Sequence, residues 1–486
     1  MSNESLKNKT IRSVGWSIIE RFSAQGIQFL LTIIIARLVS PTDYGLIAML
    51  GIFLSIAQTF VDSGFSNALV QKQNRTEYDF STVFYFNIGI GFLAYMLLFL
   101  LSPLIAIFYE EPQLEPLTRI IGINIIVTSF SVVHRAKLSI NLNFKMLSIA
   151  SVIGVIISGF IGIYFAYYGY GVWAIAIQSL LNNFLQVVAL WWLVKWKPLM
   201  IFSIESFKSL WRFGSKLLTS GLIHTLYTNS YNIVIGKVFS STELGYFNRA
   251  YTFAYFPSTN FSYVITRGIY PIFCSLQDEE DKLKSYFLKS MRISSFIIIP
   301  IMVILIVLAK PIVLLLLTEK WIGMVPLLRV LCLAYLWTPI MDINNNLINA
   351  KGLSNYFLKA EIQKKVFALI FLLCTIPFGV FVMCTGLILY SIVDWFIISK
   401  YTKITIGCGF WIQLKYICPI LIINLLLGGI VYLASLISID PLMQILCGIT
   451  MGIIVYPILT YLFKMKESDL FSNAFGVLKK YVSKYV

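Results

Sequence analysis

Five polar side chains recur at helical spacing along one face of the first apolar segment of the chain. They are Ser17, Arg21, Gln25, Gln28 and Thr32. A charge inside a bilayer costs about 2.5–3.5 kcal/mol, so such a stripe is expected to face water or protein. A guanidinium beside amides suits a phosphate or diphosphate with attached hydroxyls. The stripe therefore indicates a binding cavity. The alternative is that Arg21 reaches the membrane surface and pairs with Glu20.

Later apolar segments carry further polar candidates. The candidates for lining the same cavity are Arg249, Arg267, Asn229 and Asn232. The candidates for ion coupling or structural pairing are Asp62, Asp342 and Glu20. Both arginines also stand near segment ends, where they can anchor the helix at the membrane surface. Asparagines suit hydroxyl recognition but also join helices by hydrogen bonds, so both interpretations stay open. The pattern predicts binding and no catalytic residues.

Cysteine and histidine usage favours no metal site and no cofactor. The seven cysteines lie in or beside apolar segments and form no Cys-x-x-Cys pair, and there are only two histidines. Ordinary buried thiols are the expectation. The polar first twelve residues and the segment after them show no cleavage site, so no removable signal peptide is expected.

The composition indicates an integral membrane protein. Of the 486 residues, 58% are hydrophobic and 12% are charged. A soluble domain carries about 25% charged residues, so this chain could not cover its surface with polar groups. A net charge of +16 would suggest nucleic acid in a soluble protein. Here the basic residues lie in short loops between apolar segments, which sets orientation instead and predicts no nucleic-acid partner.

The apolar segments predict an all-α fold with about fourteen transmembrane helices, since a helical span takes about 20 residues. Expected spans lie near 14–36, 46–70, 82–108, 117–138, 147–168, 171–194, 213–238, 246–270, 292–317, 323–349, 358–378, 381–399, 411–435 and 441–463. Lysines and arginines concentrate on alternate loops, which predicts that both termini are cytoplasmic.

A repeat divides the chain into two related halves. The segment Ile35–Ile47 returns 200 positions later as Ile235–Phe247, with matching serine, threonine, acid and glycine positions. Six spans in each half place the halves in the same direction, and transporters built from parallel repeats bind substrate between them. The predicted parts are an N-terminal lobe (1–195), a cytoplasmic linker (196–212), a C-terminal lobe (213–400), two additional spans (401–466) and an amphipathic cytoplasmic tail (467–486).

Several short motifs stand out, namely Ala36–Gly45, Phe60–Gly64, Ala68–Lys72, Gly245–Tyr251, Pro257, Ser275–Asp278 and Glu319–Trp321. With these motifs the chain resembles the polysaccharide exporters (Wzx-like, polysaccharide-transporter family) of the multidrug/oligosaccharidyl-lipid/polysaccharide flippase superfamily. The resemblance covers about residues 10–400. It implies a fold like that of the multidrug exporters of this superfamily and a flippase that moves undecaprenyl-diphosphate-linked oligosaccharide. Cavities of the family are cationic, and the matching positions here are Arg21 and Arg249.

The sequence thus predicts a flippase for surface polysaccharide synthesis that works by alternating access between two lobes. Its expected partners are the lipid-linked oligosaccharide, membrane lipids and a polysaccharide polymerase, and it is expected to work as a monomer. An ion-coupled multidrug efflux antiporter of the same architecture is the alternative. A membrane glycosyltransferase or polymerase is disfavoured, because no loop is long enough for an extramembrane catalytic domain.

Overall fold

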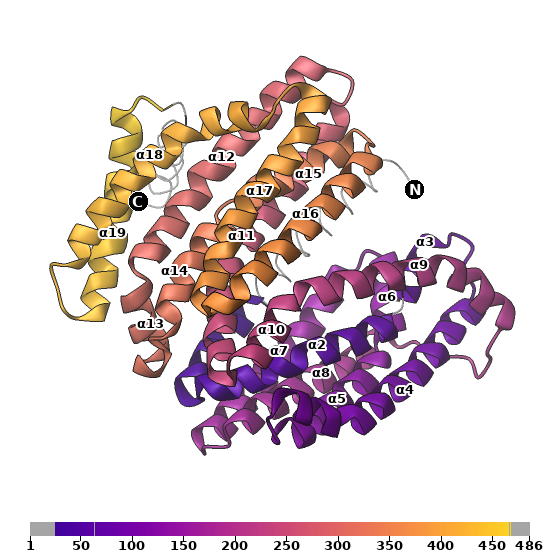
Figure 1. Cartoon of the computed structure of the whole chain (residues 1–486). Coiled ribbons are helices and arrows are strands. Elements are labelled where there is room, and N and C mark those ends of the chain that lie inside the picture. The colour runs from indigo at the N-terminus through magenta and orange to yellow at the C-terminus, as the bar shows by residue number, and fades with distance from the viewer. Residues whose placement is uncertain (1–24, 63, 466, 468–486) are drawn as a thin grey trace, which may run out of the picture. The chain divides into compact units, whose positions relative to one another are not determined.

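The chain folds almost entirely into α-helices. A computed structural model describes residues 25–62, 64–465 and 467, and no strand occurs in those ranges (Figure 1). The chain divides into two compact units, Met1–Asn248 and Arg249–Val486. The expected all-α membrane architecture is confirmed. The predicted tail (467–486), Glu20 and Arg21 fall outside the described ranges, apart from residue 467.

Within the described residues, the first unit contains a helix over Gln25–Leu38 and ten further labelled helices, of which the last continues into the second unit. They are α2 (Pro41–Asp62), α3 (Phe65–Gln71), α4 (Glu77–Tyr109), α5 (Leu114–Ser129), α6 (Val132–Ile140), α7 (Phe144–Tyr167), α8 (Val172–Val194), α9 (Ile204–Thr228), α10 (Ser230–Val238) and α11 (Ser241–Ser275). Helices α7 and α8 lie side by side, and α5 packs on both α4 and α8 (Figure 1).

The second unit continues from α11 through eight more helices. They are α12 (Glu280–Val307), α13 (Ala309–Leu317), α14 (Met324–Tyr335), α15 (Thr338–Ala350), α16 (Ser354–Thr375), α17 (Val380–Ile406), α18 (Phe410–Ser435) and α19 (Pro441–Leu462). Helices α18 and α19 form a hairpin that packs on α12, and α17 packs on α14, α15 and α16 (Figure 1).

Most expected spans coincide with a helix or with two helices separated by a short break. In the described part of the chain, nine helices are long and apolar enough to cross a membrane, or ten if the pair α5 and α6, bent by 41°, is one span. The predicted count of fourteen is therefore not confirmed. Helices α9, α11 and α16 are absent from that set, because polar and charged residues lower the mean hydropathy of a helix.

The repeated segment builds the same capped helix start twice. At the start of α2, the Ser40 backbone N–H donates to the Asp43 carboxylate (3.2 Å), and the Asp43 N–H donates to the Ser40 hydroxyl (3.2 Å). This reciprocal pair is a capping box, which satisfies amides that the helix leaves free. In the second copy, the Glu243 N–H donates to the Ser240 hydroxyl (3.1 Å). The shared sequence pattern is thus explained by shared local structure.

The two capped starts also touch each other. The Thr42 and Thr242 hydroxyl oxygens, which are equivalent in the repeat, are 2.8 Å apart. A Cβ on Gly45 would lie 1.7 Å from the Ser241 carbonyl oxygen, and one on Gly245 would lie 1.9 Å from that of Pro41. Only glycine allows so close an approach of the two backbones. We call this contact the glycine crossing.

The linker predicted at 196–212 is only partly irregular. The segment between α8 and α9 spans residues 195–203, and from residue 204 the chain is already helical. Helix α9 packs on α2, α3 and α4, and α10 packs on α2. These two helices thus belong to the first compact unit, although the predicted C-terminal lobe begins at 213. The lobe boundaries stay a prediction.

A buried polar network fixes the core of the second unit. The Asn344 amide of α15 exchanges hydrogen bonds with the Gln413 amide of α18 (3.1 and 2.9 Å) and accepts one from the Thr402 hydroxyl (2.6 Å). Gln413 also accepts from the Trp395 indole (2.7 Å) and donates to the Cys408 carbonyl (2.9 Å). Asn344, Thr402 and Gln413 are fully buried. The network therefore joins α15, α17 and α18 by direct hydrogen bonds.

Replacing Asn344 by alanine is expected to lower the free energy of unfolding by about 2–3 kcal/mol. The substitution leaves buried groups of Gln413 and Thr402 without a partner, and each unsatisfied buried group costs about 1–3 kcal/mol. Asn346→Ala on the same helix is the control, because the Asn346 amide is half-buried and donates to the Asp342 carbonyl of its own helix (2.8 Å). Thermal unfolding of the purified variants measures the difference. Equal unfolding temperatures would contradict the role of this network.

Candidate functional site

The polar stripe of the first apolar segment is described only in part. Arg21 and Ser17 lie outside the described residues. Gln25 is exposed, and Gln28 is half-buried with a buried Oε1 that accepts no hydrogen bond from the described residues. The Thr32 hydroxyl donates to the Phe29 carbonyl of its own helix (2.8 Å). Gln25 and Gln28 therefore keep amide groups free for a ligand. The Thr32 hydroxyl is already bonded within its own helix.

Asn229 and Asn232 lie at the break between α9 and α10. Asn229 stands between the two helices, and its amide donates to the Thr225 carbonyl (2.9 Å). Asn232 is half-buried, and its side chain makes no hydrogen bond within the described part of the chain. His224 and Thr228, on the preceding turn, are exposed. Of the two predicted asparagines, Asn229 uses its amide to bond a carbonyl at the end of α9. The Asn232 amide has no partner among the described residues.

A chain of polar contacts runs through the first unit from α2 to α5. The Gln58 amide donates to the Asp62 carboxylate (3.1 Å) and accepts from the Thr128 hydroxyl of α5 (2.9 Å). The charge of Arg135 on α6 also acts on the Asp62 carboxylate. Asp62 is exposed, whereas Gln58, Thr128 and Arg135 are half-buried. The aspartate therefore has structural partners and also remains accessible.

The same chain of contacts continues onto α8. The Arg135 guanidinium donates to the Gln186 amide oxygen (2.9 Å), and Gln186 donates to Asn182 (3.1 Å). The neighbouring Asn183 donates to Asn124 of α5 (3.0 Å), which in turn donates to the Ser179 hydroxyl (3.3 Å). We call these residues the polar network of the first unit, namely Gln58, Asp62, Asn124, Thr128, Arg135, Ser179, Asn182, Asn183 and Gln186.

The polar network of the first unit combines one guanidinium with several amides and hydroxyls among apolar helices. Most of its members are half-buried, so their remaining donors and acceptors can meet a polar ligand. A guanidinium binds phosphate oxygens in pairs, and amides bind sugar hydroxyls. Arg135 was not among the candidates from the sequence, where it is one of the basic residues near the end of the expected span 117–138. No local pattern indicates its link to Asp62, because Asp62 and Arg135 lie far apart in the sequence.

The predicted arginines of α11 have different environments within the second unit. Arg249 is 8% exposed. Arg267 is exposed, and its guanidinium lies 4.4 Å from the centre of the Tyr263 ring. Between them, the rings of Tyr251 and Tyr255 are stacked (4.9 Å), and Tyr335 of α14 packs edge-on against both. Aromatic faces of this kind suit the apolar faces of sugars.

A buried ionic cluster joins α16 and α17 in the second unit. The Lys364 ammonium lies 2.6 Å from the Glu361 carboxylate and 3.1 Å from the Asp394 carboxylate. Lys364 is 5% exposed. Asp342 of α15 accepts a hydrogen bond from the Ser262 hydroxyl of α11 and acts electrostatically on Asp394. Asp342 thus belongs to a larger group of charged residues. The sequence alone did not indicate that these residues lie together.

An acidic loop lies beside the glycine crossing. The Lys237 ammonium donates to the Glu110 carboxylate (2.8 Å), and the Ser241 hydroxyl donates to Glu111 (2.9 Å). The hydrogen bond from Lys237 holds the pKa of Glu110 below its ordinary value. The Val172 N–H at the start of α8 donates to Asp43 (3.1 Å). The acids of this region therefore tie the starts of α2, α8 and α11 to the end of α4.

Comparison with known proteins places the chain among polysaccharide biosynthesis proteins. A family described as "polysaccharide biosynthesis protein" matches residues 34–326, more than half of the chain. The chain is 25% identical to the lipopolysaccharide biosynthesis protein WzxC of Escherichia coli (strain K12) over 366 residues, which are 74% of each chain. It is 26% identical over 356 residues to the teichuronic acid biosynthesis protein TuaB of Bacillus subtilis (strain 168), covering 72% of each.

Solved structures share the fold at low sequence identity. The lipid II flippase MurJ in an inward closed conformation matches with a TM-score of 0.77 and 16% identity, over 94% of this chain and all of that one. An inward-facing multidrug resistance transporter of the multidrug and toxic compound extrusion (MATE) type, from the superfamily named above, matches with a TM-score of 0.61 and 16% identity, over 80% of this chain and 98% of that one. These likenesses confirm the expected fold.

Proposed function

Because the chain belongs to the polysaccharide biosynthesis protein family, we propose that it is a flippase for lipid-linked oligosaccharides. It moves undecaprenyl-diphosphate-linked repeat units across the bacterial inner membrane for the synthesis of a surface polysaccharide. The observation that carries this proposal is the polar network of the first unit, an arginine surrounded by amides and hydroxyls within helices that are otherwise apolar. A glycan with an anionic diphosphate needs this combination.

Guanidinium groups and side-chain amides both bind the substrate. Arg21 and Arg249 hold the diphosphate, with Arg135 as a further cation, because guanidinium groups pair with phosphate oxygens. Gln25, Gln28 and Asn232 contact sugar hydroxyls, with Asn229 and Arg267 at the margin. The buried Oε1 of Gln28, which has no partner among the described residues, supports this assignment, since a buried amide group without a partner is costly unless a ligand or water satisfies it.

The orientation follows from the distribution of lysine and arginine. Both termini lie in the cytoplasm, so the starts of α2 and α11 with their glycine crossing lie at the outer surface. Alternating access requires the outer ends of the two repeats to separate in one state and to meet in the other. The glycine crossing is the closed form of this outer gate. The protein works as a monomer and passes its product to a polysaccharide polymerase.

Ion coupling involves the acids that face cations in the structure. Asp62 lies within the electrostatic reach of Arg135, and Asp342 within that of Lys364. Protonation of either acid would change the net charge beside a cation and so the relative energy of two conformations. Glu20 is a further candidate from the sequence alone.

Replacing Arg135 by glutamine is expected to reduce export by about tenfold or more, because a hydrogen bond to a charged group contributes about 1.5–3 kcal/mol. Arg135→Lys is expected to recover export only in part, since lysine cannot bind in a bidentate manner. Arg119→Gln is the control. Arg119 lies near the start of α5, pairs with Glu115 on the same helix and is not part of the polar network of the first unit. Surface polysaccharide at matched protein levels is the measurement. Full export by Arg135→Gln would contradict the role of this residue.

An ion-coupled multidrug efflux antiporter is the second candidate, and the structural likeness to the MATE transporter favours it. Cells without the protein distinguish the two. A flippase predicts loss of surface polysaccharide with complete lipid-linked units still present, and unchanged drug sensitivity. An efflux antiporter predicts normal polysaccharide and increased sensitivity to several cationic drugs.

A further inference from the structure

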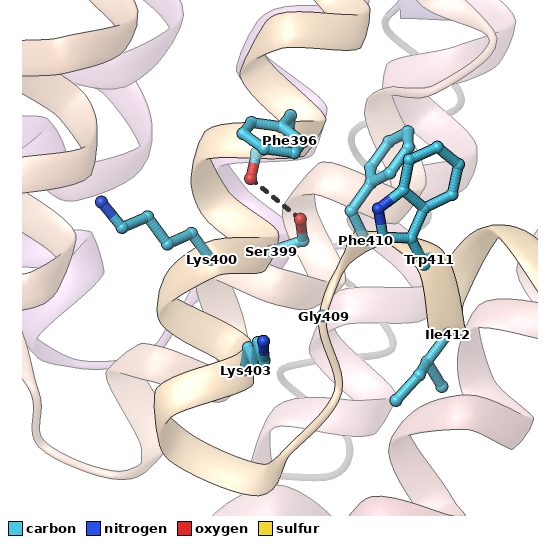
Figure 2. Close-up of a pocket in the computed structure, with 8 residues that line it drawn as sticks. All are labelled: Phe396, Ser399, Lys400, Lys403, Gly409, Phe410, Trp411 and Ile412. Carbon is cyan, nitrogen blue, oxygen red and sulfur yellow. Dashed lines mark hydrogen bonds between the residues drawn. The ribbon is translucent and has the colours of Figure 1, made fainter.

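A pocket of about 350 Å³ lies at the turn between α17 and α18. Residues from both helices line it, namely Phe396, Ser399, Lys400, Lys403, Gly409, Phe410, Trp411 and Ile412. Figure 2 shows the two lysines on the α17 side and the Trp411 ring and Ile412 on the α18 side. The pocket thus lies at the junction between the last helix of the predicted C-terminal lobe and the first of the two additional spans.

The walls of the pocket are apolar except at one end. Phe396, Trp411 and Ile412 are 53%, 74% and 40% exposed, and the Phe410 ring packs against Phe396 (5.6 Å). The Ser399 hydroxyl already donates to the Phe396 carbonyl (2.9 Å), so it offers little to a ligand (Figure 2). Exposed aromatic and aliphatic walls of this kind suit an acyl chain at the membrane surface.

The polar end of the pocket carries positive charge without compensation. Lys400 and Lys403 are exposed and form no ion pair with any residue that the structure describes. The Lys284 ammonium lies 3.7 Å from the place that a Cβ on Gly407 would take, so a third cation is close to the same turn. The sequence contains no aspartate or glutamate between Trp395 and Ile439. A ligand with a negative charge is therefore favoured.

Hydrogen bonds define the backbone of the turn that shapes the pocket. Gly407 ends α17 with a positive φ of 72°, which favours glycine, and its N–H donates to the Lys403 carbonyl (2.9 Å). Gln413, one helical turn into α18, is buried and donates to the Cys408 carbonyl. The Lys403 side chain lies over Gly409, with its Cδ 3.1 Å from the position of an added Cβ. These hydrogen bonds fix the backbone that carries the lysines and the aromatic wall.

We propose that this pocket binds an anionic phospholipid of the inner leaflet. The ammonium groups of Lys400 and Lys403 attract the phosphate, and the first part of one acyl chain lies against Phe396, Trp411 and Ile412. Orientation supports this occupant, because the turn between α17 and α18 is cytoplasmic in the predicted topology, and the cytoplasmic leaflet attracts clustered lysines. The lipid stabilises the junction between the two additional helices and the rest of the second unit.

Native mass spectrometry of the full-length protein tests the proposal directly. Phosphatidylglycerol is titrated against phosphatidylethanolamine with the same acyl chains. Wild-type protein is expected to prefer phosphatidylglycerol. Lys400→Gln/Lys403→Gln is expected to bind it about 30-fold more weakly, since each lysine near an anionic lipid contributes a factor of about 5. The control Lys351→Gln/Lys359→Gln removes the same charge from another predicted cytoplasmic position and is expected to keep wild-type affinity.

A second measurement uses the wild-type protein alone and so does not depend on the folding of a variant. A photoactivatable phosphatidylglycerol is expected to label peptides within residues 396–412. Labelling only elsewhere, equal affinity for both lipids, or unchanged binding by Lys400→Gln/Lys403→Gln would overturn the proposal. Displacement of phosphatidylglycerol by undecaprenyl phosphate at far lower concentration would overturn it too, because the pocket would then belong to the transported lipid. None of these results depends on export.

Discussion

A Thr42→Cys/Thr242→Cys variant is expected to lose nearly all export when its two thiols are oxidised and to regain export after reduction. The two threonine hydroxyls are 2.8 Å apart, and the glycines beside them let the helix starts approach closely. A disulfide holds Cα atoms within about 4.4–6.8 Å, so it prevents the outer ends of the two repeats from separating. Because alternating access needs that separation, the oxidised protein is expected to remain in one state.

The experiment uses a variant in which the seven native cysteines are replaced. All seven lie after residue 273, away from the two threonines in the sequence. The two single-cysteine variants receive the same oxidant and control for effects other than the crosslink. Mass spectrometry of the joined peptides gives the crosslinked fraction, and surface polysaccharide gives export. Normal export by fully crosslinked protein would show that the glycine crossing does not open during transport.

Replacing Lys364 by alanine is expected to lower the free energy of unfolding by about 3–5 kcal/mol. Lys364 is 5% exposed and pairs with Glu361 and with Asp394, whose side chain is 13% exposed. Removing the ammonium leaves the Asp394 carboxylate nearly buried without its cation, which is much more costly than losing a surface pair. The measurement is thermal unfolding of purified protein together with the amount of protein in the membrane.

Two further variants separate the buried pair from general effects. Lys365→Ala is the matched control, because Lys365 is the next residue, is 29% exposed and lies 3.7 Å from Glu361. It is expected to change stability by less than about 1 kcal/mol. Lys364→Met/Asp394→Leu is expected to recover much of the loss, because removal of both charges leaves none buried alone. Equal stability of Lys364→Ala and Lys365→Ala would contradict this account.

The sequence predicted the helices well because a span must be long and apolar. The expected segments near 82–108 and 147–168 correspond to α4 (Glu77–Tyr109) and α7 (Phe144–Tyr167). The repeat of Ile35–Ile47 reflects the capping of helix starts by Ser40 and Ser240. Hydropathy does not predict where a span breaks. The break between α9 and α10 is an example. Such breaks depend on contacts between helices, which a local pattern does not contain.

The candidate site was less predictable, since its contacts join residues far apart in the sequence. Arg135 reads as one of many cytoplasmic basic residues until the structure places its guanidinium on Gln186, 51 positions later. Asp394 stands alone in its segment, and its partner Lys364 is on the preceding helix. Helical periodicity relates residues three or four apart and says nothing about which helix faces which. The contributions of Arg21 and Glu20 stay predictions from the sequence.

The central claim is export of a complete lipid-linked oligosaccharide, and its most direct measurement is the leaflet in which that lipid resides. Lipid-linked units are extracted from cells with and without the protein, after glycans exposed at the outer surface have been labelled with a reagent that does not cross the membrane, and are quantified by mass spectrometry. The account predicts that complete, unlabelled units accumulate on the inner leaflet when the protein is absent. A normal pool with normal labelling and normal surface polysaccharide would contradict it.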